Sequence, residues 1–232
     1  RLEGTILRQA NLYQGNLSQA SLVGADLTRA VLEDSNLVGA DLRHARLSNA
    51  NLSRAIGDEA ALYNVNLAGA QLLVSSFERA HFEGADLASA DLTYASLTNA
   101  YFYGANLAGA ILVNTDLSEA DLRRTVLTKA NLHSANLQGA LLDGALLDGA
   151  QMDESYLEGA YLDDTSLVGA NLREAIIRGA DLRYANFRSA RLQQTDLEGA
   201  NMEGAQLVKA QVQSSNLRMA ILYKATDRKS VV

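Results

Sequence analysis

The chain of 232 residues contains no cysteine, which excludes disulfide bridges, thiolate nucleophiles and cysteine-ligated metal sites. This absence leaves the cellular compartment open. No apolar run approaches the roughly 18 residues expected of a membrane-spanning helix, and no signal-peptide pattern opens the sequence. The first residue is Arg1 and not an initiator Met, so we expect a piece of a longer protein.

What the chain does contain is a five-residue unit, repeated from Leu2 to Leu222 without net insertion or deletion. We number its positions one to five, so that residues 1–5 form the first unit. Position two holds Leu or another large apolar residue, and position five holds Ala or another small residue. Gly57 is the one exception at position two. A tandem repeat across the whole chain predicts a repeat architecture.

Neither a helix nor a straight strand suits a period of five. Five residues turn a helix by about 140°, which would spread the leucines around its whole surface. In a strand, an odd period would send successive leucines to opposite faces. The unit therefore needs a corner, and 15 of the 17 glycines occupy position four. A glycine in one fixed position favours a positive φ, as in the third residue of a type II turn.

The exceptions at position five show how many corners close one coil. Ser or Thr replaces Ala in a column of residues that are spaced by multiples of 20: 35, 75, 115, 155, 195 and 215. The remaining Thr and Val replacements, at 5, 65, 125 and 165, share a second such column. The true repeat is therefore 20 residues, which make four sides of a square coil. Residue n should lie beside residue n+20.

The units ANLHS (130–134), ADLRY (180–184) and ADLTR (25–29) match A-(D/N)-L-x-x. The sequence thus resembles the pentapeptide-repeat family, in its Leu-rich form, over residues 2–225. The resemblance implies an all-β fold: a right-handed quadrilateral β-helix of about 11 coils of 20 residues. We expect one solenoid over residues 1–225, with Leu and the small residue pointing inward, and a short tail at 226–232.

Residues 55–61, AIGDEAA, form the one local irregularity. The repeat keeps its phase on both sides, so we interpret it as a distortion and not as a domain boundary. Phe77 lies one coil beyond Gly57, and its ring is expected to fill the space that the glycine leaves. The alternative is a bulge that binds a partner.

No set of residues predicts catalysis, a metal site or a cofactor. A convex rod offers no cleft in which Ser, His and Asp could converge, so we expect no enzyme activity. Of the three histidines, His44 and His81 should lie about 10 Å apart on one side, and His133 lies on another. The glycines mark corners and do not form a phosphate-binding loop, because none leads into a helix.

The outer surface carries one acidic segment. Between Lys129 and Arg173 there is no Lys or Arg, and the seven acidic residues there form what we call the acidic belt: Asp143, Asp148, Asp153, Glu154, Glu158, Asp163 and Asp164. We consider three interpretations of the belt: a solvated surface, a docking surface for a basic protein, and a cation site at Asp143, Asp163 and Asp164. No side collects a basic stripe, which argues against direct nucleic-acid binding.

Two further surface patterns follow the 20-residue repeat. Glu158, Arg178, Glu198 and Arg218 alternate in charge along one column and predict a salt-bridge ladder. Five tyrosines share the first side of the coil: Tyr63, Tyr101, Tyr103, Tyr161 and Tyr223. Exposed tyrosines on a stiff surface can anchor a protein partner, and the alternative is packing between neighbouring coils.

We therefore predict a non-enzymatic solenoid scaffold for protein–protein interaction, with the acidic belt and Tyr63, Tyr101, Tyr103 and Tyr161 as candidate partner-binding residues. The alternative is a DNA-mimicking modulator of DNA gyrase, which the family resemblance implies. Members that protect gyrase are more pervasively acidic and richer in core Phe than this chain. Because the terminal coils have unpaired backbone groups, we also expect end-to-end self-association.

Overall fold

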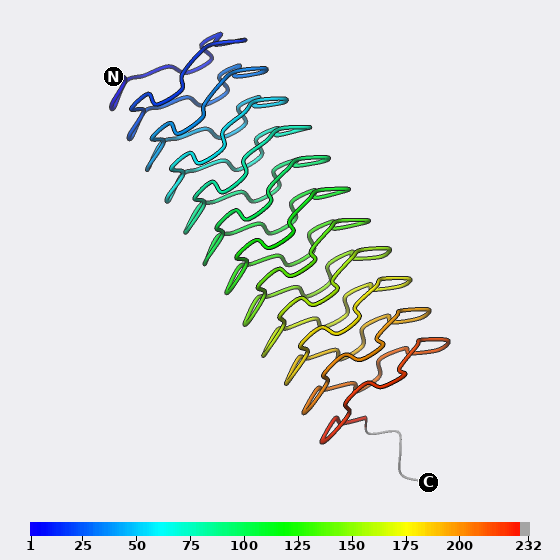
Figure 1. Cartoon of the computed structure of the whole chain (residues 1–232). Coiled ribbons are helices and arrows are strands. Elements are labelled where there is room, and N and C mark those ends of the chain that lie inside the picture. The colour runs from blue at the N-terminus through cyan, green and yellow to red at the C-terminus, as the bar shows by residue number, and fades with distance from the viewer. Residues whose placement is uncertain (228–232) are drawn as a thin grey trace.

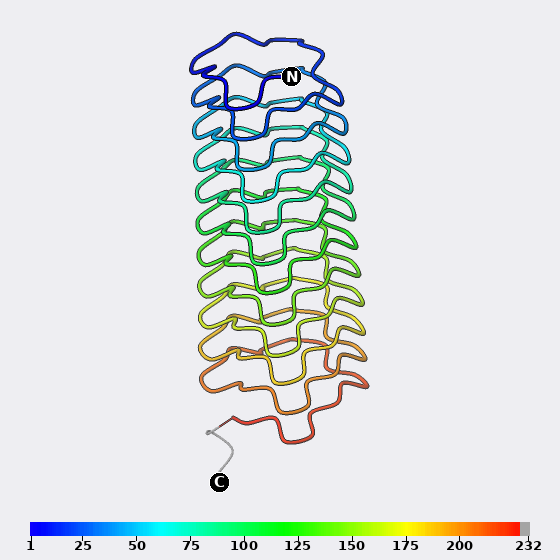
Figure 2. The same ribbon diagram turned by 90° about the vertical axis from the view of Figure 1, so that its left-hand side faces the viewer.

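Parallel backbone bridges join residue n to residue n+20 along the chain, from Ile6↔Asp26 to Gln206↔Thr226. The computed structural model describes residues 1–227, which wind into a rod of stacked four-sided coils (Figures 1 and 2). The fold is the predicted all-β, right-handed quadrilateral β-helix, and the register of 20 is confirmed. We number its sides one to four, beginning with residues 1–5, 6–10, 11–15 and 16–20.

Each contact between coils is one bridge residue wide. Within residues 1–227, position one of every unit from Ile6 onward is an isolated bridge, positions three and four form a turn, and no helix or longer strand occurs. No helix among these residues is therefore long or apolar enough to cross a membrane.

Backbone hydrogen bonds explain how such short contacts hold the coils together. The N–H groups at positions two and four donate to the next coil, as in Leu62 N–H to His81 O at 2.7 Å. The N–H at position one donates to the preceding coil, and the N–H at position five closes the turn within its own unit. In coils with a neighbour on both sides, only position three lacks a backbone acceptor, so nearly every buried N–H group there is satisfied.

The turns have the predicted positive φ at position four. Fifteen glycines have φ between 61° and 69° there, and non-glycine residues fill the other units with φ between 53° and 62°. Even the β-branched Val74 has φ 56°. A side chain in this region costs roughly 1–2 kcal/mol, so the cross-coil hydrogen bonds and the core hold the turns against a local preference.

The core is a column of leucines and alanines. From Leu22 to Ala205, the large apolar side chains at position two and the alanines at position five are 0–2% exposed. Phe82 and Phe102 are 20 residues apart, and they stack with ring centroids 4.7 Å apart and planes inclined by 1°, as the predicted register requires. A Cβ on Gly57 would lie 2.1 Å from the Phe77 ring. The ring therefore fills the space beside this glycine, and the bridges at Ile56 continue without a bulge.

The buried hydroxyl groups at position five are part of the turns. Thr125 Oγ1 donates to Leu122 O at 2.6 Å in its own unit, and Thr115 Oγ1 donates to Leu92 O at 2.8 Å in the preceding coil. Ser75 Oγ donates to Leu72 O at 2.7 Å. Ser35 differs, because its hydroxyl is buried and has no hydrogen-bond partner among the described residues.

This difference predicts opposite effects of the same substitution. Ser35→Ala should raise the melting temperature, because an unpaired buried hydroxyl costs about 1–3 kcal/mol. Ser75→Ala is the matched control and should lower it, because a hydrogen bond that contributes about 0.5–1.5 kcal/mol is lost. Thermal unfolding followed by circular dichroism measures both. Equal shifts of one sign would show that the two hydroxyls have equivalent environments.

Candidate interaction surfaces

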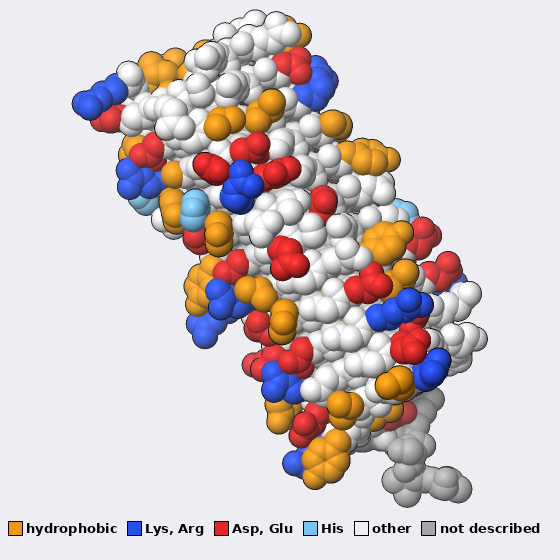
Figure 3. All heavy atoms as spheres, in the orientation of Figure 1, with side chains coloured by type: hydrophobic (Ala, Val, Ile, Leu, Met, Phe, Trp, Pro, Cys, Tyr) orange, Lys and Arg blue, Asp and Glu red, His pale blue; other side chains and the backbone are white. Residues whose placement is uncertain are grey.

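Positions one, three and four of each unit point outward, so all candidate functional residues lie on the four sides of the rod. The surface is convex, with charged and apolar side chains interspersed on the face that Figure 3 shows. The described surface includes open hollows. One of about 350 Å³ is lined by Arg8, Gln9, Thr28, Arg29 and Asn49, and one of about 210 Å³ by Asp153, Glu154, Asn171, Arg173 and Glu174.

Asn and Asp at position one have a structural role in many units. Their side-chain Oδ1 accepts the N–H at position three, the one that has no backbone acceptor. Asn51 Oδ1, for example, accepts from Ser53 N–H at 3.0 Å, and Asp91 Oδ1 accepts from Thr93 N–H at 3.0 Å. The preference for Asn or Asp before Leu therefore reflects a short side chain that caps the turn.

Part of the acidic belt replaces this cap where position one cannot supply it. Ser166 and Tyr161 occupy position one of their units. Asp148 Oδ1, in the preceding coil, instead accepts from Val168 N–H at 3.1 Å and from Ser166 Oγ at 2.5 Å. Asp143 Oδ1 likewise accepts from Asp163 N–H at 3.1 Å. Both carboxylates therefore have a structural role through Oδ1, and their contact with a partner stays a prediction.

In the rest of the acidic belt, Asp153, Glu158 and Asp163 are half-buried, and Glu154 and Asp164 are exposed. Glu158 accepts a hydrogen bond from Gln138 Nε2 at 2.5 Å. Within residues 1–227, Glu154 and Asp164 are exposed, and their carboxylates accept no hydrogen bond from the protein. The three residues considered for a cation site, Asp143, Asp163 and Asp164, do not form a compact ligand set, although one oxygen of Asp163 is buried without a partner.

Side one carries a stacked row of aromatic rings. The ring of His81 lies between Tyr63, at 5.0 Å and 19°, and Tyr101, at 4.6 Å and 8°. The imidazole Nδ1 lies 3.0 Å from Glu83 Oε1. Burial, and then the Glu83 carboxylate, raise the pKa of the Tyr63 hydroxyl above its ordinary value. Tyr101 therefore packs between coils, as one interpretation expects, and it remains 39% exposed. Partner binding by these tyrosines stays a prediction.

Other tyrosines of side one stand farther out. Tyr103 is 43% exposed and lies under the guanidinium of Arg124, 5.9 Å from its ring centroid. Tyr161 is 49% exposed. Tyr184 is 54% exposed and leans over Gly204. Sequence reasoning missed Tyr184, although the 20-residue register alone places this residue on side one.

The predicted salt-bridge ladder on side four is largely wrong. Its four residues share a column, but only Arg218 and Glu198 pair within it, with Nη1 and Oε1 3.7 Å apart. Arg178 instead donates from Nε to Asp196 Oδ2 at 2.6 Å, and this hydrogen bond raises the pKa of its guanidinium. Arg178 is at position three, and Asp196 is at position one of the next coil on the same side. The side chain of Arg178 reaches Asp196 and bonds to it in place of Glu198.

The histidines differ in their surroundings. His44 and His81 lie on side one, as expected, and His133 lies on side three. His133 Nδ1 is 2.6 Å from Asp153 Oδ2, one coil further on. Together with Glu154 it forms a set of three groups whose ligand atoms lie within 4.8 Å of one another. Sequence reasoning considered only spacings between histidines and missed this set, although His133 and Asp153 share one column of the 20-residue register.

The first and last described coils leave part of the apolar core accessible. Leu2, Leu7, Leu12 and Leu17 are only partly buried, and Leu222 is 42% exposed. End-to-end self-association of this polypeptide stays a prediction. Of the tail at 226–232, residues 228–232 lie outside the described part of the chain.

These features define the class: a β-solenoid of five-residue units with outward side chains on four flat sides. The family model for pentapeptide repeats matches in 8 copies, over residues 1–34, 35–72, 75–109, 100–139, 110–149, 150–188 and 185–222. The chain belongs to the pentapeptide repeat family. No curated protein sequence gives a significant match.

Solved structures of the family are also similar to the chain. HetL, a protein involved in heterocyst differentiation regulation from the cyanobacterium Nostoc sp. strain PCC 7120, is 31% identical, with 99% of this chain and 92% of HetL covered and a TM-score of 0.45. Rfr23 from the cyanobacterium Cyanothece 51142 is 34% identical over 40% of this chain and 63% of that one, with a TM-score of 0.38. QnrB1, a plasmid-mediated fluoroquinolone resistance protein, is 18% identical over 90% and 91% of the chains, with a TM-score of 0.33.

The structural role of Asp148 can be tested by substitution. Asp148→Ala should destabilise the protein by about 1–3 kcal/mol, because it leaves Val168 N–H without an acceptor. Glu158→Ala changes the same turn position but removes only an exposed contact, so it should stay within about 0.5 kcal/mol of the parent. Chemical denaturation of both variants gives the comparison. Equal stabilities would mean that the Asp148 carboxylate does not cap the neighbouring turn.

Proposed function

We propose that this protein is a non-enzymatic, rigid scaffold that binds a protein partner through side one. The observation that carries this proposal is the stacked row Tyr63–His81–Tyr101, which the cross-coil register fixes on a flat surface. Rings that are already ordered lose little conformational entropy on binding. Tyrosine is also among the residues that contribute most to protein interfaces.

The tyrosines supply an interface centre with charged residues around it. Tyr101 and Tyr103 are neighbours on one unit, each about two-fifths exposed, and Tyr161 extends the surface three coils further on. Exposed carboxylates of the acidic belt, including Asp164 on the same side, favour a partner with basic groups at the rim of its surface. The carboxylates that cap turns do not belong to this interface.

We also propose that the protein has no enzyme activity. One of the hollows described above gathers arginines and amides, and the other gathers mainly acidic groups. The one hydroxyl among their lining residues, that of Thr28, donates to Asp26 Oδ1 at 2.6 Å. Hydrogen bonds from Thr28 and Arg8 lower the pKa of Asp26 to about 2, which makes this carboxylate a poor general base.

The alternative, a DNA-mimicking modulator of DNA gyrase, requires a denser negative surface. B-DNA carries one negative charge per roughly 1.7 Å of its axis, and a rod of about 11 coils spaced by about 4.8 Å would need roughly 30. The formal net charge of this chain is −7. Several of its carboxylates also pair with arginine, as Asp41 does with Arg43 at 2.7 Å and Asp121 with Arg123 at 2.7 Å. Charge therefore favours the scaffold.

Partner capture with surface variants tests the scaffold proposal. The double variant Tyr101→Ala, Tyr103→Ala should lose proteins that the parent retains from an extract of its source cells, with affinity for a purified partner lowered at least ~30-fold. Tyr94→Ala removes a ring that is even more exposed, at 61%, from side three and should retain them. Unchanged capture by the double variant would contradict docking on side one.

A DNA gyrase supercoiling assay separates the two functions. The scaffold proposal expects no inhibition and no drug protection by micromolar protein. Inhibition at sub-micromolar concentration would support the DNA-mimic alternative and overturn the preference for a scaffold.

A further inference from the structure

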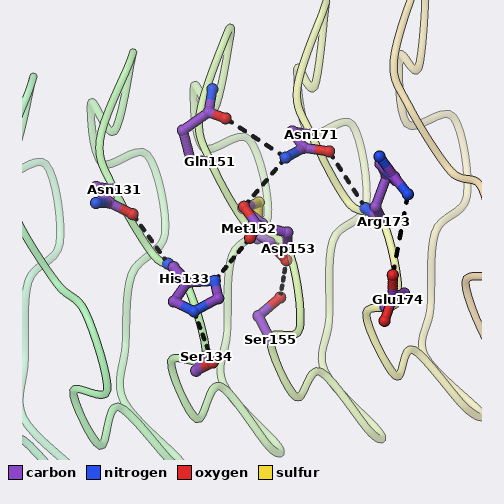
Figure 4. A network of polar contacts seen from close by, with 10 residues as sticks. All are labelled: Asn131, His133, Ser134, Gln151, Met152, Asp153, Ser155, Asn171, Arg173 and Glu174. Carbon is purple, nitrogen blue, oxygen red and sulfur yellow. Dashed lines mark hydrogen bonds and ion pairs between the residues drawn. The ribbon is translucent and has the colours of Figure 1, made fainter.

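We propose that His133, Asp153 and Glu154 on side three bind a divalent transition-metal ion of the Zn²⁺ type. The three residues come from two neighbouring coils and meet at the surface of the rod. Figure 4 shows two of them, His133 and Asp153, with the polar contacts around them. This site is independent of the tyrosine surface on side one.

The coil register brings these groups together. His133 and Asp153 both occupy position three on side three, one coil apart, so their side chains leave the backbone side by side. Glu154 follows at position four, where φ is 59° and the turn points its side chain outward. The cross-coil hydrogen bond from Ser134 N–H to Asp153 O, at 3.0 Å, fixes the two turns relative to each other.

The distances are close to those that a metal ion requires. One ligand atom from each residue lies within 4.8 Å of the other two. Bond lengths of about 2.0–2.2 Å in a tetrahedral zinc site place ligand atoms roughly 3.4 Å apart. The imidazole is 38% and the Asp153 carboxylate 30% exposed, and Glu154 is exposed. The small rotations needed are therefore open to all three side chains.

The chemistry of the three groups favours a transition metal over Mg²⁺ or Ca²⁺. Imidazole nitrogen suits Zn²⁺, Cu²⁺ or Ni²⁺, whereas Mg²⁺ and Ca²⁺ prefer oxygen ligands alone. Two carboxylates supply the charge that a divalent ion needs. The hollow of about 210 Å³ beside Asp153 and Glu154 gives access from solvent. Arg173 lines the same hollow, and its Nη2 lies 4.0 Å from Glu174 Oε1, which offsets part of its charge.

A second histidine–carboxylate pair, His81 and Glu83, lacks the third ligand group that the proposed site has. His81 lies 3.0 Å from Glu83, but its ring is stacked between two tyrosines. Among the described residues, no third ligand group joins that pair. His81 therefore provides a matched control within the same molecule.

Isothermal titration with ZnCl₂ on the chain without a histidine tag tests the proposal. We expect one ion per chain at micromolar affinity, and much weaker binding of Mg²⁺. His133→Ala and Glu154→Gln should each weaken Zn²⁺ binding at least ~10-fold, because even changes in residues behind the ligands cost about 10–100-fold. His81→Ala should bind like the parent.

Circular dichroism of the metal-free variants separates loss of a ligand from loss of the fold. Glu154→Gln is the safer variant, because it alters an exposed side chain without changing its size. Failure of the parent to bind Zn²⁺, or equal affinity of the parent and both His133→Ala and Glu154→Gln, would overturn the proposal. Weakening by His81→Ala alone would also overturn it, by moving the site to side one.

Discussion

The structure depends on hydrogen bonds between residue n and the coil 20 residues away. In each unit with a coil on both sides, the N–H groups at positions one, two and four bond to a neighbouring coil, and the N–H at position five closes the corner. The leucine column stabilises the stack, with roughly 1.5–3 kcal/mol for each buried side chain before chain entropy is subtracted. The hydrogen bonds set its register. The turns keep a positive φ even at Val74 because both act together.

The same register decides which outward side chains can act together. It stacks Tyr63, His81 and Tyr101 into one surface and brings His133 beside Asp153. It also divides the acidic residues by role. Asp143 and Asp148 accept backbone N–H groups of the next coil, whereas Glu154 and Asp164 remain accessible. The acidic residues of the belt therefore differ in whether their carboxylates also bond to the protein itself.

The backbone could be predicted from the sequence because its signals repeat in every unit. The period placed Leu137 in the core and Phe82 against Phe102, and both placements are confirmed. The side-chain partners on the surface could not be predicted in the same way. Arg178 lies in a column with Glu198, yet it bonds to Asp196, and only local geometry selects that partner. The hydrogen bond from Val168 N–H to Asp148 could not be predicted either. It forms because position one of that unit holds Ser166 and not Asn or Asp.

Amide hydrogen exchange measured residue by residue is the most direct test of this register. In the central coils, the account predicts slow exchange at positions one, two, four and five, and faster exchange at position three, where only a side chain accepts the N–H. This pattern should recur every five residues. Exchange at positions one and two of a central coil as rapid as at position three would contradict the account.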